Sequence, residues 1–176
     1  MLAQCEHDKD ARAYLVCFSE EFALSVEKQA QKFLKTLPTK EIAQESFDKS
    51  LAIVVSTLEE AVQIANEKAP EHLELCLSNA GTKSDLFRNY GSLFIGNYSA
   101  EVYGDYVTGT NHTLPTNGYA TAYSGVNLDS FCRKITYQEL TPEGIRSIGR
   151  TVELMAEAEQ LFAHKNAMTL RLQLCR

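Results

Sequence analysis

The pattern of hydrophobic and polar residues alternates between two periods along the first hundred positions. Four short apolar runs predict buried strands: AYLVCFS (13–19), LAIVVS (51–56), HLELCL (72–77) and SLFIGNY (92–98). Stretches of helical character lie between them: EEFALSVEKQAQKFLKTL (20–37), KEIAQESF (40–47), LEEAVQIANEKA (58–69) and a short piece around DLFRNYG (85–91). Because strands that alternate with helices form βαβ units, we predict an α/β fold: an incomplete Rossmann-like parallel sheet with helices on both faces.

Local signals also set the helix boundaries. Thr57 and Glu60 have the spacing of a capping box, which predicts that a helix begins directly after Thr57. Pro70 disfavours helical backbone in the residue before it, so this helix should stop at Ala69. The triplet TPE (141–143) has the order of an N-cap followed by a first-turn proline, which predicts another helix start.

The second part of the chain has a different character. Residues 105–128 are rich in glycine, threonine, asparagine, proline and tyrosine without a sustained period, which predicts a long loop that is either functional or disordered. FCRKITYQEL (131–140) predicts a short strand, and the remainder is helical with an apolar face that needs another surface. We predict a Rossmann-like domain over 1–127 and a C-terminal, mainly helical appendage over 128–176.

Composition and charge narrow the classes of partner. With 44% hydrophobic and 23% charged residues, the chain has the composition of a folded, soluble protein and not of a disordered one. Its net charge of −6, without a compensating Lys/Arg cluster, argues against nucleic acid. No apolar run is long enough to cross a bilayer, and MLAQCEHDKDAR lacks the features of a signal peptide. Five scattered cysteines without a CxxC fit reduced thiols, so we expect a cytoplasmic protein without a membrane partner.

Four polar residues in distant segments form a candidate metal set. They are Gln4, His7, Asp105 and His164. Singly, each has an ordinary interpretation: a solvated turn for Gln4 and His7, a turn or cap for Asp105, and a helix-end position for His164. Together, two imidazoles, one carboxylate and one amide carbonyl are N and O ligands suited to zinc or a similar divalent metal.

Glu71 and His72 are a candidate pair of bases. Adjacent strand residues face opposite ways, so both reach one substrate only if Pro70 holds them in irregular backbone at the start of the strand. A carboxylate and an imidazole would suit a reaction with two proton transfers, although a solvent-exposed polar pair explains them equally well. His112 either binds substrate or stabilises its own loop, and Glu159 is otherwise a solvated helix carboxylate.

Several long motifs together resemble the histidinol dehydrogenase family. They are APEHLEL (69–75), GDYVTGTNHTLPTNGYA (104–120), AEQLFAHKNAMTLRL (158–172) and LAQCEHD (2–8), the last similar to the family's S-Q-A-E-H segment. The motifs occur in the family's order through essentially the whole chain, and they correspond to the C-terminal part of that enzyme. The resemblance implies NAD-dependent oxidation of L-histidinol through the aldehyde to L-histidine, the end of histidine biosynthesis, with two NAD reduced in succession.

The resemblance also implies roles for individual residues. Gln4, His7, Asp105 and His164 match the zinc ligands, in a family where zinc holds the substrate. His72 matches the base that takes the alcohol proton, and Glu71 matches the residue that activates water to attack the aldehyde. Glu159 matches a substrate contact, and His112 lies where a further substrate contact is expected. The family is a homodimer with a swapped C-terminal domain, so His164 and Glu159 are expected to complete the partner's site.

The match lacks most of the family's NAD site. The sequence contains no G-x-G-x-x-G motif, and the upstream part of the family's chain, with its main NAD contacts and a substrate-binding serine, is absent. We therefore expect little activity from this chain alone. Two interpretations follow: part of a zinc- and NAD-dependent histidinol dehydrogenase, or a truncated relative that binds zinc and histidinol-like ligands without dehydrogenase activity. A third, purely structural interpretation is a fragment that only dimerises through its helical end.

Overall fold

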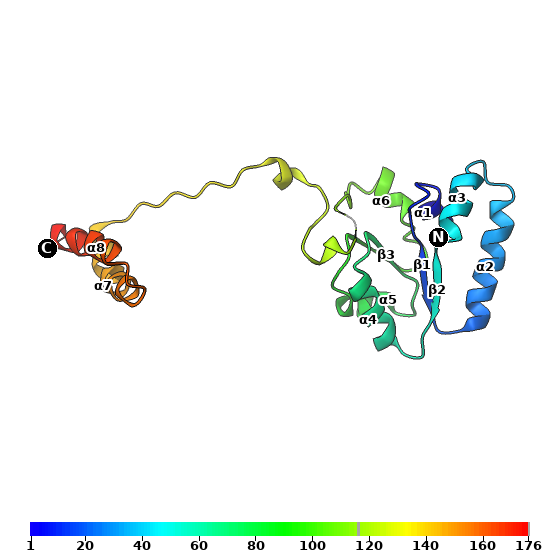
Figure 1. Cartoon of the computed structure of the whole chain (residues 1–176), viewed down its shortest axis with the longest axis horizontal. Helices are drawn as coiled ribbons and strands as arrows, with labels where there is room; N and C mark the ends of the chain where they lie inside the picture. Colours follow the sequence, from blue (N-terminus) through cyan, green and yellow to red (C-terminus); the bar gives the residue numbers. More distant parts are fainter. Residues whose placement is uncertain (116, 176) are drawn as a thin grey trace. The chain divides into compact units, whose positions relative to one another are not determined.

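The computed structural model describes residues 1–115 and 117–175, which form two compact units, Met1–Phe131 and Cys132–Arg176 (Figure 1). Each unit is described by itself. The helices and strands of the first unit are α1 (Leu2–Cys5), β1 (Tyr14–Cys17), α2 (Glu20–Leu34), α3 (Lys40–Phe47), β2 (Leu51–Val54), α4 (Leu58–Lys68), β3 (His72–Leu75), α5 (Ala80–Lys83), η1 (Ser84–Leu86), β4 (Ser92–Ile95), α6 (Val102–Tyr106), η2 (Tyr119–Thr121) and η3 (Leu128–Phe131). The second unit contains α7 (Pro142–Ala158) and α8 (Phe162–Leu174).

The strands of the first unit pair in parallel, as the alternation of strands and helices predicted. β1 pairs with β2, with Tyr14 opposite Leu51, and β3 pairs with β4, with His72 opposite Ser92. Within the described residues the two pairs form separate two-stranded sheets. The prediction of a mixed α/β fold with parallel strands is therefore confirmed.

The helix boundaries follow the local signals in the sequence. Thr57 accepts a hydrogen bond from the backbone N–H of Glu60 at 3.2 Å, and the Glu60 carboxylate accepts one from the N–H of Thr57 at 3.3 Å. This is the predicted capping box, and it fixes the start of α4. The helix ends where Ala69, directly before Pro70, adopts a left-handed φ of 46°. The turn that follows leads straight into β3.

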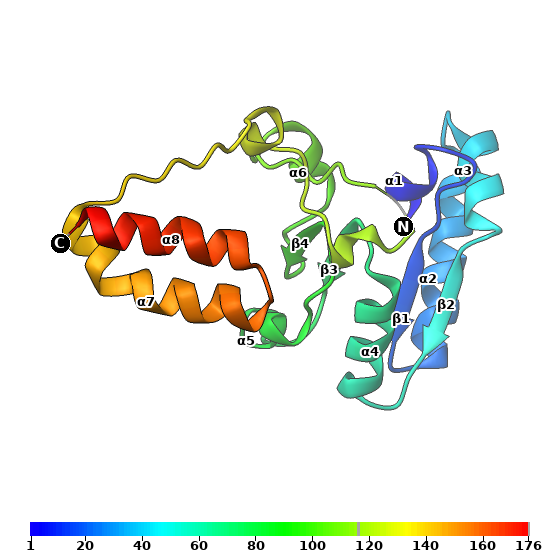
Figure 2. The same ribbon diagram turned by 60° about the vertical axis from the view of Figure 1, so that its left-hand side comes forward.

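The buried core of the first unit lies in two clusters. One joins Cys5 of α1, Ala13, Leu34 and Ala43, and so packs the start of the chain against α2 and α3. The other joins Ala65 of α4, Leu75 of β3, Ala80 and Phe87. Figure 2 shows α2 running alongside β1 and β2, with which it is in contact. The second cluster anchors the far end of β3 and so supports the strand that begins at His72.

Two sequence expectations are wrong. The segment 131–140, predicted as a strand, does not form one: Phe131 ends η3, and residues 132–140 have no regular secondary structure and are exposed. A strand needs a neighbouring strand for its backbone hydrogen bonds, and no strand of the described residues pairs with this segment. Within the predicted loop 105–128, α6 includes Asp105 and Tyr106, because the helix begins at Val102, before the glycine-rich part.

The second unit is a helical hairpin. Its first helix, α7, begins at the predicted site, where the Thr141 side chain accepts a hydrogen bond from the N–H of Gly144 at 3.1 Å and Pro142 occupies the first turn. The two helices pack against each other, and the buried Glu153 of α7 accepts hydrogen bonds from Thr169 of α8 and from Arg150 (Figure 2). No helix among the described residues combines the length and apolar character of a membrane span.

Candidate active site and metal centre

Five of the predicted site residues meet in the first unit although they come from three distant segments. Helix α1 and the turn after it provide two of them, β3 one, and the α6 region with its following loop the other two. They are Gln4, His7, His72, Asp105 and His112. The contacts between them define one polar cluster, in which Gln4, His72 and His112 are partly buried and His7 and Asp105 are exposed.

His72, the first residue of β3, is held in one tautomer. Its Nδ1 lies 2.8 Å from the side-chain carbonyl oxygen of Gln4, which can only accept a hydrogen bond. The imidazole therefore donates from Nδ1, and Nε2 keeps its lone pair. This Nε2 is buried and has no hydrogen-bond partner among the described residues. A neutral imidazole with an unpartnered Nε2 lone pair has the form that a general base requires.

His112 stands against His72 from the loop that follows α6. The two rings meet edge to face, with centroids 4.0 Å apart and planes at 88°. His112 Nε2 lies 3.2 Å from the Asp105 carboxylate, within ion-pair distance when the ring is protonated. Its Nδ1 is buried without a partner in the described part of the chain. The pair therefore presents two polar ring atoms that a small ligand could satisfy.

Glu101 is a member of the cluster that the sequence analysis missed. It stands immediately before α6, is only 8% exposed, and places Oε1 3.8 Å from His72 Nδ1. Its N–H donates to the Glu74 carboxylate at 3.0 Å, and one of its carboxylate oxygens lies within 4.8 Å of donor atoms of His7 and Asp105. The signal was present in the sequence: Glu101 and Asp105 are four residues apart, the spacing of neighbours on one helix face. The predicted loop begins at residue 105, within this helix, which separates the two residues in the sequence prediction.

Burial shifts the pKa values of two groups in opposite senses. Burial, followed by the charge of His112, lowers the pKa of His72 to about 4, against the opposing effect of Asp105. Burial, followed by the hydrogen bond to Asp105 and the charge of that residue, raises the pKa of Glu101 to about 7. At neutral pH the His72 ring is therefore uncharged, and Glu101 is close to half ionised.

These shifts predict how the stability of the first unit depends on pH. Between pH 4.5 and 7 the folded state holds a proton on Glu101 that the unfolded state has released, so this carboxyl destabilises the fold as pH rises. His72 acts oppositely, since between pH 4 and 6.5 the unfolded state binds more protons. Replacing Glu101 with glutamine removes only the first effect. We compare the unfolding free energy of Glu101→Gln with that of the wild type at each pH. This difference should rise in favour of the variant by roughly 2–3 kcal/mol from pH 4.5 to pH 8.

Urea unfolding of the 176-residue chain at several pH values tests this expectation. The matched control is Glu67→Gln, which removes the same charge from an exposed carboxylate of α4. Its difference from the wild type should stay constant across the pH range. Parallel pH curves for wild type and Glu101→Gln would contradict the assigned shift.

The cluster offers donor atoms of the type that zinc prefers. One ligand atom each from His7, Glu101 and Asp105 lies within 4.8 Å of the others. Donor atoms around a tetrahedral zinc lie about 3.3 Å apart, because the bonds are about 2.0 Å long. Small side-chain rotations would close this group around an ion, and Glu101, His72 and His112 form a second such group. The residues therefore fit a divalent metal with N and O ligands.

The backbone before β3 is fixed by close contact with Gly91. The N–H of Gly91 donates to Pro70 at 2.9 Å, and the next N–H, of Ser92, donates to Glu71 at 2.8 Å. A Cβ on Gly91 would lie 2.6 Å from the carbonyl oxygen of Glu71 and would collide with the Leu114 side chain. Glu71 thus precedes the strand in a bend, whereas His72 is already the first residue of β3. Only glycine allows the segment before β3 and the segment before β4 to approach each other this closely.

Gly91→Ala should therefore destabilise the first unit by about 1–3 kcal/mol, the usual cost of overpacking. Urea or thermal unfolding measures this change. Gly81→Ala in α5 is the matched control, since a Cβ there meets nothing within 4 Å. That variant should be neutral or more stable by up to about 1 kcal/mol, because alanine favours a helix over glycine. Equal stabilities for the two variants would contradict the packing argument.

The remaining predicted residues lie in the second unit. Glu159 caps the C-terminal end of α7, and His164 lies in the first turn of α8. Both are exposed on the hairpin. The first unit alone therefore brings together three of the four predicted metal ligands.

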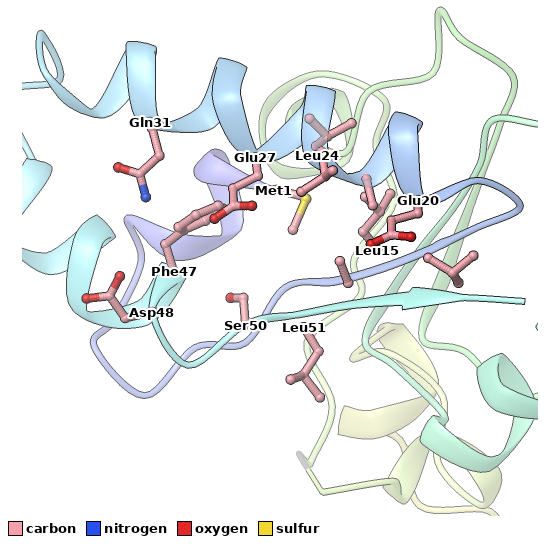
Figure 3. A pocket seen from close by; sticks show the side chains of 14 residues that line it. Met1, Leu15, Glu20, Leu24, Glu27, Gln31, Phe47, Asp48, Ser50 and Leu51 are labelled. Atoms are coloured by element: carbon pink, nitrogen blue, oxygen red, sulfur yellow. The ribbon is translucent and has the colours of Figure 1, made fainter.

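A cavity of about 660 Å³ lies elsewhere, between α2 and the β1–β2 pair (Figure 3). Apolar side chains such as Leu15, Leu24 and Phe47 line it together with a few carboxylates and amides. None of the predicted site residues is among its lining residues. It offers no set of converging bases comparable to that of the polar cluster.

The family model described as histidinol dehydrogenase matches residues 1–172. A histidinol dehydrogenase of Bacteroides thetaiotaomicron is 48% identical over 172 residues, and one of Mannheimia succiniciproducens is 44% identical over 172 residues. Each alignment covers 98% of this chain and 40% of the relative. A crystal structure of histidinol dehydrogenase from Elizabethkingia anophelis matches with a TM-score of 0.91 and 46% identity, over 98% of this chain and 40% of that one. The chain thus spans about 40% of the length of the relatives it matches.

Proposed function

Because the chain belongs to the histidinol dehydrogenase family, we propose that it carries the proton-transferring and substrate-holding part of a site that oxidises L-histidinol through L-histidinal to L-histidine. Membership of this family implies a role in histidine biosynthesis. The observation that carries the proposal is the set of buried polar atoms without a partner among the described residues. They are Nε2 of His72, Nδ1 of His112 and Oε1 of Glu101. Buried polar atoms are normally satisfied, so a polar ligand is the simplest partner for them.

His72 is proposed to take the proton of the substrate alcohol. The Nε2 lone pair accepts this proton while the carbinol carbon loses hydride, which leaves an aldehyde. The hydrogen bond from Nδ1 to Gln4 keeps the lone pair at Nε2. His112, at right angles to the base, is proposed to contact the substrate through its free Nδ1.

Glu71 is proposed to act in the second half of the reaction. Its carboxylate would take a proton from water as the water oxygen bonds to the aldehyde carbon. The anion of the hydrate formed in this way then loses the remaining hydride of the reacting carbon and becomes the carboxylic acid. The close contact of the Glu71 backbone with Gly91 supports this role, because it fixes where the carboxylate begins.

Zinc is proposed to be held by Gln4, His7, Asp105 and His164. The first three meet in one cluster, and the donor atoms of His7 and Asp105 already lie within reach of a common ion. When bound, zinc would hold the substrate's imidazole and amine and leave the redox step to other groups. His164 and Glu159 are proposed to reach the site of a partner subunit through a swapped C-terminal helical domain.

The remaining assignments also belong to the proposal. NAD would accept both hydrides, but no residue of this chain is assigned to it, so we expect the 176 residues alone not to turn over. The two parallel strand pairs are proposed to be parts of one Rossmann-like sheet, in a domain over 1–127 followed by the helical domain over 128–176. The enzyme is proposed to be a cytoplasmic homodimer.

Calorimetry on the 176-residue chain tests the metal and substrate site. We expect zinc to bind at one ion per chain and L-histidinol to bind only when zinc is present. Asp105→Ala should weaken zinc binding by about 10-fold or more, since it removes a charged ligand and the partner of His112. The matched control is Asp85→Ala, an aspartate of η1 outside the cluster, which should leave both affinities unchanged.

The same binding measurements, together with an assay of NADH formation, distinguish the proposed function from the alternative of a ligand-binding relative without dehydrogenase activity. Zinc-dependent histidinol binding without NADH production, even when NAD is supplied, would fit a relative that binds its ligand but does not turn it over. Absence of both zinc and histidinol binding would contradict the proposed site in this chain.

A further inference from the structure

The carbonyl oxygen of Gln4 has two candidate partners. It accepts a hydrogen bond from His72 Nδ1 at 2.8 Å, and under the proposed function it is also a zinc ligand. A metal ligand directs its best electron pair at the ion, and a small rotation of the Gln4 amide toward His7 and Asp105 would draw the oxygen away from His72. The buried Nδ1–H would then lose its partner, which is costly in a shielded site.

A second acceptor already stands beside this nitrogen. Oε1 of Glu101 lies 3.8 Å from His72 Nδ1, about 1 Å beyond a charge-assisted hydrogen bond. This oxygen is buried and has no hydrogen-bond partner among the described residues. The Glu101 backbone is fixed by its own N–H, which donates to Glu74 at 3.0 Å. A side-chain rotation alone would therefore bring the carboxylate to His72.

We propose that Glu101 is a positioning residue that takes over the hydrogen bond from His72 Nδ1 when the Gln4 carbonyl turns to the metal. The ligand role of Gln4 rests on the proposed function, whereas the exchange of acceptors rests on the geometry of three side chains. In both states the proton stays on Nδ1, and the lone pair stays on Nε2. Metal loading would then leave the orientation and tautomer of the base intact.

Removing each acceptor tests the exchange without any metal. Nitrogen-15 NMR of the histidine rings separates a protonated ring nitrogen from a bare one, and it is measured on the 176-residue chain. The variants are Gln4→Leu, Glu101→Met and the double variant, with Glu67→Gln as the charge-matched control. We expect His72 to keep its Nδ1–H tautomer in each single variant, because one acceptor remains. The double variant should lose it and show a mixture of both tautomers.

Two results of this NMR experiment would overturn the proposal. A mixture in Gln4→Leu alone would overturn the proposal, because Glu101 would have failed to replace Gln4. Retention of the tautomer in the double variant would also overturn it, since a third group would then hold the ring. If Glu101→Met does not fold, Glu101→Gln replaces it in the Gln4→Leu background. The amide accepts more weakly than the carboxylate, so the ring N–H proton should resonate further upfield than in Gln4→Leu alone, and equal shifts would contradict the proposal.

Zinc alone, added to the wild type, provides a separate measurement. We expect the Nδ1–H proton to move downfield, to the position seen in metal-free Gln4→Leu, because both states would share the carboxylate acceptor. Failure of zinc to bind would count against the proposed metal set, while the Gln4→Leu result would still decide the role of Glu101. A second zinc that requires both His72 and Glu101 would overturn the proposal, since the ring would then be a ligand.

Discussion

Replacing His72 with asparagine is expected to slow histidinol oxidation by about 100- to 10,000-fold, the usual contribution of a general base. Asparagine is the informative choice because its amide nitrogen reaches roughly the position of Nδ1. It can therefore still donate to Gln4, as His72 does at 2.8 Å. What it lacks is a base at the position of Nε2. The rate of NADH formation, in a histidinol dehydrogenase that includes this chain, measures the effect.

Zinc content separates this role from a role in metal binding. His72→Asn should retain the zinc of the wild type, because the proposed ligands Gln4, His7 and Asp105 are untouched. His7→Ala is the contrasting variant, and it should lose both zinc and activity. Loss of zinc in His72→Asn would contradict the assignment of His72 as a base. An unchanged rate of NADH formation would contradict it as well.

Much of the first unit could be predicted from local pattern. The helix α3 has the predicted bounds, and the capping box at Thr57 and Glu60 is formed. The four predicted strands are present, but each is only four residues long and so shorter than the apolar run that predicted it. The apolar runs continue past the last residue that pairs with a neighbouring strand. Period and capping depend on neighbours within a few positions, which is why they can be read from one sequence.

The segment 132–140 shows where such reading fails. Its composition suits a strand, but a strand is completed by a partner that no local pattern supplies. Its backbone stays irregular and exposed in the described residues. The helix around Asp105 was missed for a related reason, since the glycines that follow it made the whole segment resemble a loop. That error concealed the spacing of Glu101 and Asp105.

The site itself was expected because of family resemblance and not because of spacing. Gln4 and His72 are 68 positions apart, and their hydrogen bond follows from the packing of α1 against the rest of the unit. The roles assigned to these residues stay predictions, although the side chains meet. What the structure adds is the tautomer of His72 and the position of Glu101, neither of which a motif encodes.

Replacing Glu71 with glutamine is expected to separate the two halves of the reaction. The substitution keeps the size of the side chain and the backbone contact with Gly91, but removes the carboxylate. Oxidation of histidinol to the aldehyde should continue, because His72 serves that step. Oxidation of supplied histidinal should fall by about 100- to 10,000-fold, since no group would take the proton of the attacking water. NADH formation from each substrate, measured separately, gives the two rates.

Glu67→Gln is the matched control, because Glu67 is an exposed carboxylate only four positions before Glu71 in the sequence. Glu67 lies in α4 and accepts a hydrogen bond from Gln63 at 2.8 Å. It changes the net charge equally and should leave both rates unaltered. A normal rate on histidinal in Glu71→Gln would exclude water activation by this residue. An equal loss on both substrates would instead mean that Glu71 supports the His72 base, since a water-activating carboxylate has no part in the first hydride transfer. The ratio of the two losses in rate therefore shows whether Glu71 and His72 serve separate steps of the reaction.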